Sequence, residues 1–75
     1  MNPAVEYRKL QGDMRALIER FPVVLNEHVA RQEATSHYWS HVGDLRKARL
    51  DLLHVMAFLG DLDSKEMLLA EGESR

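Results

Sequence analysis

The chain has 75 residues, with 12 acidic against 10 basic side chains, four histidines and no cysteine. This length leaves room for one small hydrophobic core, and the lack of cysteine excludes disulfide bonds and thiolate zinc sites as sources of stability. A formal net charge of -2 lacks the general positive field that a dedicated nucleic-acid or anionic-membrane binder usually presents.

The first predicted element is a long helix that runs to about Glu33. Its apolar residues recur at alternating steps of three and four, as on the packing face of a helix. They are Tyr7, Leu10, Met14, Leu17, Phe21, Val24 and His28. Asn2 is placed to cap this helix and Pro3 to occupy its first position. Because the apolar phase continues across Pro22, we favour one kinked helix over two helices joined by a loop.

A second helix is predicted after a break at residues 34–36. Thr35 and Ser36 offer hydroxyl groups that can cap its N-terminus. Gly43 weakens the start of this helix, because glycine costs about 1 kcal/mol relative to alanine in a helix interior. The apolar positions of the second helix are Tyr38, Val42, Leu45, Leu52, Met56 and Leu59.

A short third helix is predicted near the end of the chain. Gly60 suits a left-handed cap that ends the second helix. Asp63 and Glu66 have the spacing of a capping box, which indicates a helix that begins at Ser64. We expect one helical domain over residues 1–71, followed by a frayed polar tail at 72–75.

These elements predict an all-α fold in which the two long helices form an antiparallel hairpin, with the short helix at its C-terminal end. The seam of this hairpin would be lined by Leu10, Met14, Leu17, Phe21, Leu52, Met56 and Leu59. Two helices cannot enclose so many large side chains, and burying each one is worth about 1.5–3 kcal/mol. We therefore predict a homodimeric four-helix bundle, with a closed three-helix monomer as the alternative.

The candidate partner-binding residues lie at the start and middle of the second helix. Tyr38 and Trp39 belong to the residue types that dominate the energetics of protein interfaces. Arg46, Lys47 and Arg49 could orient an acidic partner surface. The alternative is a nucleic-acid or anionic-ligand binder in which Arg20 joins these three basic residues.

The histidines raise the question of a metal site. His37 and His41 are four residues apart, the spacing at which two imidazoles on one helical face can share a metal, and the hairpin would bring His28 near them. Nothing in the sequence fixes the geometry of these ligands. We therefore expect a solvated or half-buried histidine cluster, and neither a metal nor another cofactor.

The sequence contains no motif for catalysis: no Gly-rich phosphate loop, no serine elbow, no cysteine nucleophile and no HExxH. We expect a non-enzymatic regulator, inhibitor or adaptor that occupies a surface of another protein. A subunit that only assembles into a larger complex is a further alternative. Neither an apolar run of about 18 residues nor a signal-peptide pattern is present, so we expect a cytoplasmic protein without a membrane partner.

Two features of the sequence can be compared with known proteins: the YRKL of residues 7–10 and the tryptophan at the start of the second helix. In these features the chain resembles small helical-hairpin proteins of phages that bind host factors or signalling nucleotides. The resemblance implies a phage-type accessory protein, and no family is assigned from it.

Overall fold

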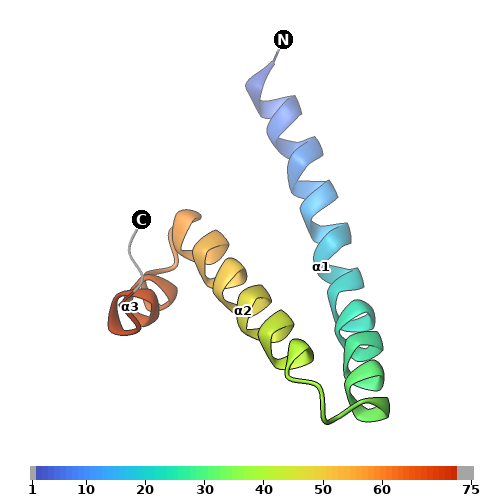
Figure 1. Ribbon diagram of the computed structural model, residues 1–75. Helices are drawn as coiled ribbons and strands as arrows, with labels where there is room; N and C mark the ends of the chain where they lie inside the picture. Colours follow the sequence, from blue (N-terminus) through green and yellow to red (C-terminus); the bar gives the residue numbers. More distant parts are fainter. Residues whose placement is uncertain (1, 73–75) are drawn as a thin grey trace. The chain divides into compact units, whose positions relative to one another are not determined.

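The computed structural model describes residues 2–72, and all of its regular structure in this range is helical (Figure 1). Three helices follow one another: α1 spans Pro3–Ala34, α2 spans Ser40–Phe58 and α3 spans Leu62–Ala70. The predicted all-α class and the number of helices are therefore confirmed. Among the described residues, no helix combines the length and the apolar character needed to cross a bilayer.

The chain divides into two units, with the boundary between Ser36 and His37. The first unit consists of α1, and the second contains α2 and α3, which pack against each other. The hairpin of the two long helices, the homodimeric bundle and the single domain over residues 1–71 stay predictions. Residues 73–75 of the predicted tail lie outside the described range.

α1 begins and continues as the sequence predicts. The Asn2 side chain accepts a hydrogen bond from the backbone N–H of Ala4 at 3.0 Å, and Pro3 occupies the first helical position. The helix runs without interruption through Pro22, which excludes two helices separated by a loop. No residue of α1 is buried.

The start of α2 differs from the prediction. The Thr35 hydroxyl donates a hydrogen bond of 2.9 Å to the backbone carbonyl of Arg31, four residues back, so it closes the end of α1 instead of capping α2. α2 begins at Ser40, with Trp39 at the N-cap position and no side-chain hydrogen bond to the cap. His37 therefore lies in the turn before α2, and the prediction that it shares a helical face with His41 is wrong.

The turn from α2 to α3 is fixed by Gly60, as predicted. Gly60 has a φ of +110°, in the region that side chains with a Cβ rarely adopt. Its N–H donates to the carbonyl of Ala57 at 3.1 Å, and the N–H of Asp61 donates to the carbonyl of Met56 at 3.0 Å. These two bonds form a Schellman motif, which satisfies carbonyls that the helix end leaves without partners.

α3 begins two residues earlier than predicted, with Asp61 rather than Asp63 at the N-cap. The Ser64 hydroxyl donates a 2.6 Å hydrogen bond to the Asp61 carboxylate, and this contact ties the first turn of α3 together. Ser64 is buried with Leu53 and Leu68, and these two leucines are the buried hydrophobic residues of the described chain. The small core of the second unit thus lies at Leu53, beside the predicted seam residues. The seam residues of α2 are exposed: Leu52, Met56 and Leu59.

Candidate partner-binding site

Two large aromatic side chains, Tyr38 and Trp39, stand exposed at the start of α2, and we refer to them as the aromatic pair. Trp39 is 80% exposed, although its backbone is held in place because its carbonyl accepts a hydrogen bond from the N–H of Gly43 at 3.1 Å. Tyr38 is 54% exposed, and its ring centroid lies 4.1 Å from that of His37. The segment before α2 therefore presents two aromatic rings to solvent, and the Trp39 carbonyl is bonded into the first turn of the helix.

The three predicted cationic residues follow on α2, and two of them have carboxylate partners. The Lys47 ammonium group lies 2.6 Å from the Asp51 carboxylate, one helical turn ahead. The Arg49 guanidinium group donates two hydrogen bonds to the Glu71 carboxylate, at 2.8 and 3.1 Å. The positive charge that a phosphate would need is thus compensated at these two positions. Arg46 is the third predicted cation on this helix.

The pair of Arg49 and Glu71 connects α2 to the residue that ends α3. A guanidinium fork that meets both oxygens of a carboxylate is the strong, geometrically specific form of an ion pair. The hydrogen bond from Arg49 lowers the pKa of the Glu71 carboxyl below its ordinary value, and the same bond raises the pKa of Arg49. This pair therefore links the helices of the second unit as well as neutralising a cation.

The nucleic-acid alternative loses support from these contacts. It needs positive charge on Arg46, Lys47 and Arg49 that is available to a phosphate, but Lys47 and Arg49 each have a carboxylate partner. Recognition of phosphate gains its affinity from cations that release counterions on binding. Lys47 and Arg49, with their carboxylate partners, are poorly suited to that role.

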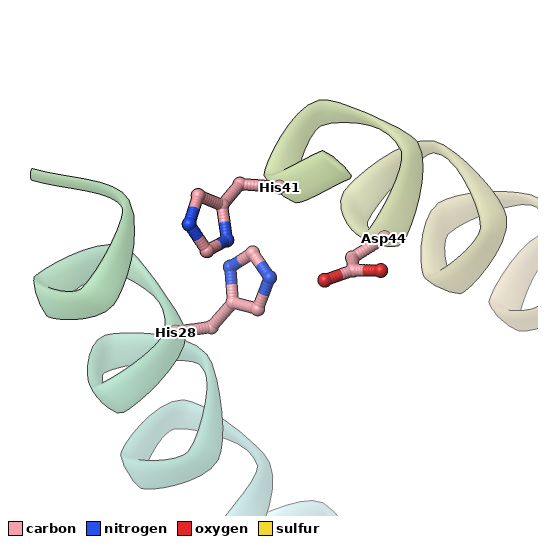
Figure 2. A group of neighbouring side chains, drawn as sticks. All are labelled: His28, His41 and Asp44. Atoms are coloured by element: carbon pink, nitrogen blue, oxygen red, sulfur yellow. The ribbon is translucent and has the colours of Figure 1, made fainter. Parts of the chain in front are cut away.

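Two of the polar residues near the start of α2 share one helical turn. Figure 2 shows the side chains of His41 and Asp44, three residues apart on α2, together with His28 of α1. His41 and Asp44 are the members of this group that the second unit contains, and His28 belongs to the first. Two ligands are fewer than the three or four protein ligands of zinc sites. The second unit by itself therefore offers too few ligands for a zinc site, and the structure places His37 outside α2.

Comparison of the chain with protein-family models, with curated proteins and with solved structures finds no match. The site residues are therefore assigned from their exposure, charges and contacts. Sequence reasoning missed the role of Glu71, because it belongs to an acidic end of the chain with no periodic relation to Arg49. Phe58, 87% exposed, is a further exposed aromatic residue at the opposite end of α2 from the aromatic pair.

Proposed function

We propose that the protein is a small non-enzymatic regulator, inhibitor or adaptor that acts in the cytoplasm by occupying the surface of another protein. The observation that carries this proposal is the exposure of Trp39, together with Tyr38, on a backbone fixed at the start of α2. Tryptophan and tyrosine are enriched among the few residues that supply most of the binding energy of interfaces. The aromatic pair is therefore the anchor of the proposed contact.

The basic residues of α2 are better suited to orienting a partner protein than to supplying the affinity for it. Arg46 and the two paired cations lie on the same helix as the anchor, within about three turns of Trp39. Charges at the rim of an interface chiefly change the rate and direction of association. We thus assign binding energy to the aromatic pair, and a preference for an acidic partner surface to Arg46.

The proposed assembly is the one that the apolar periodicity favours. We propose that α1 and α2 form an antiparallel hairpin and that two copies pair as a four-helix bundle. Within the described residues 2–72, only two hydrophobic residues are buried, Leu53 and Leu68, which is few for a range of this length. Larger exposed apolar patches on soluble proteins commonly mark interaction sites, which supports pairing as well as binding to a partner.

The test of the proposed function uses Trp39→Ala, with Phe58→Ala as the matched control. Both substitutions remove an exposed aromatic ring from an end of α2. The tagged wild-type chain is used to capture a partner from native cells, and the purified partner is then titrated calorimetrically with each variant. A hot-spot residue contributes 2 kcal/mol or more, so Trp39→Ala should weaken binding roughly 30-fold or more, while Phe58→Ala should change it little.

Two outcomes would contradict this assignment. Equal affinities of the wild type and Trp39→Ala would remove the aromatic pair from the contact. A steep loss of affinity as ionic strength rises would indicate phosphate binding by the cationic residues, because a largely apolar contact depends only weakly on salt.

A further inference from the structure

The apolar face of α1 is a regular stripe that the helix alone leaves open. Its members are six residues at alternating steps of three and four, between 41% and 71% exposed: Tyr7, Leu10, Met14, Leu17, Phe21 and Val24. This spacing averages 3.5 residues, the repeat of helices that pack along a coiled-coil seam. It implies a helical occupant of similar length.

The two flanks of this stripe differ in charge. On one side lie four uncharged residues: Ala4, Gln11, Ile18 and Leu25. On the other side lie four charged residues: Glu6, Asp13, Arg20 and Glu27. In a parallel pair of identical helices, each flank faces the opposite flank of the second copy. In an antiparallel pair, each flank faces its own kind.

We propose that α1 pairs with α1 of a second copy in an antiparallel arrangement centred between residues 15 and 16. In this register Met14 faces Leu17 of the second copy, and the two neighbouring layers also match apolar with apolar. Leu10 then faces Phe21 of the second copy, and Tyr7 faces Val24. All six residues of the stripe then face an apolar residue of the second copy. This pairing rests on the proposed four-helix bundle and specifies the contact between its two copies as α1 against α1.

The apolar layers agree with this register better than with its neighbours, and two ion pairs form beside the central layers. Asp13 faces Arg20 of the second copy, so the symmetry produces two ion pairs beside the central layers, whereas Glu6 faces Glu27 towards the ends. Sliding one helix by seven residues in one direction places Arg20 opposite Arg20 and Asp13 opposite Glu27. Sliding it the other way places Asp13 opposite Asp13, although Glu6 then faces Arg20. That register leaves Val24 without an apolar layer and sets Phe21 against Pro3 instead of a residue of the stripe.

A parallel pair is disfavoured because it sets Asp13 against Ile18 and Arg20 against Leu25. Burial of charged groups beside apolar ones, without partners, costs free energy. A membrane surface is disfavoured by charge, because α1 contains five basic and five acidic residues, whereas helices that lie on anionic membranes are rich in lysine and arginine. The pairing is separate from the proposed aromatic anchor, so Trp39→Ala should dimerise like the wild type.

The orientation is tested on the full chain by disulfide formation, since the chain has no cysteine of its own. Leu10→Cys and Phe21→Cys chains, tagged to differ in mass, are mixed and oxidised. The antiparallel pair should give the mixed disulfide between positions 10 and 21. It should not join position 10 to position 10, because 11 residues of helix separate them by about 16 Å, beyond the ~7 Å that a disulfide spans between Cα atoms.

The control for this experiment is Glu19→Cys, on the face of α1 opposite the stripe, which should form no disulfide with either chain. Like-with-like disulfides at both position 10 and position 21 would overturn the proposal in favour of a parallel pair. A wild-type chain that stays monomeric at 100 µM in sedimentation would also overturn the proposal. The stripe would then be covered by a membrane surface, which binding to anionic vesicles would show, or by another part of the same chain.

The register is tested by charge exchange, with dimer dissociation followed by sedimentation and helicity by circular dichroism. Asp13→Arg should weaken the dimer about tenfold, because two attractive pairs become repulsive ones. Adding Arg20→Asp to the same chain should restore the wild-type affinity. Glu19→Arg changes the charge equally on the opposite face and should have little effect. Failure of the double variant to recover, with α1 still helical, would contradict this register.

Discussion

Gly43 lies within α2 and Gly60 just after its end, and these two backbone environments give the glycines opposite roles. Gly60 has a left-handed φ and donates the hydrogen bond that ends the helix. Gly43 lies in the first turns of α2, and an added Cβ would meet no atom within 4 Å. The first position needs glycine for its conformation, whereas the second has the space and the geometry for alanine.

Alanine at these two positions should therefore change stability in opposite directions. Gly60→Ala should lower the free energy of unfolding by about 1–2 kcal/mol, because a Cβ is strained in the left-handed region. Gly43→Ala should raise it by about 0.5–1 kcal/mol through helix propensity. Urea denaturation followed by circular dichroism measures both changes. A loss of stability in Gly43→Ala would mean that this position contacts something besides its own helix.

Glu71 gives the second unit a stability that depends on pH. Its pKa is lowered in the folded state by the hydrogen bond from Arg49. A lowered carboxyl pKa stabilises the fold fully above the ordinary glutamate range, and this contribution is lost as the pH falls through the lowered pKa. We expect Glu71→Gln to be less stable than the wild type at pH 7 and to lose less stability on acidification. Thermal unfolding at pH 7 and pH 3 tests this, and parallel pH curves for the two chains would exclude the effect.

The role of a cap residue could be predicted from the sequence only where its side chain or backbone had a single favourable role. Asn2 before Pro3, and Gly60 at the end of an apolar pattern, each had a single favourable role, and both predictions are confirmed. Thr35 had two, because its hydroxyl could cap α2 or bond back to α1, and in the structure it donates to the carbonyl of Arg31 in α1. The pair of Arg49 and Glu71 depends on how α3 returns to α2, which no local pattern encodes.

At the scale of elements, the period of the apolar residues predicted the helices well and their ends poorly. α1 ends at Ala34, one residue beyond the prediction, because the phase of its stripe spans the whole helix. The apolar pattern of α2 was extended back to Tyr38, but the helix starts at Ser40. Tyr38 has the spacing of the apolar positions of α2 but lies outside the helix, because a single residue can match a helical repeat by chance. The candidate site lies in this short segment, where periodicity carries least information.

At the scale of the whole molecule, little apolar surface is buried within the described chain. Leu53 and Leu68 are buried, and 22 large hydrophobic residues are exposed. A chain of this length gains little stability from its own core and often depends on association. Exposed apolar residues therefore allow the sequence to indicate that the chain associates, but they do not specify the binding partner.

Stability that depends on association should also depend on protein concentration. We expect the midpoint of thermal unfolding to rise by roughly 5 °C for a tenfold increase in chain concentration, because assembly favours the folded state by mass action. Scanning calorimetry from 10 to 100 µM measures this shift. A constant midpoint over that range would indicate that each chain folds alone.

The passage of α1 through Pro22 leaves one gap in its ladder of backbone bonds. A proline nitrogen carries no hydrogen, so the Ile18 carbonyl, four residues earlier, receives no donor from within the helix. The helix therefore consists of two hydrogen-bonded stretches that meet at this turn. Either stretch can loosen at this carbonyl while the other keeps its turns intact.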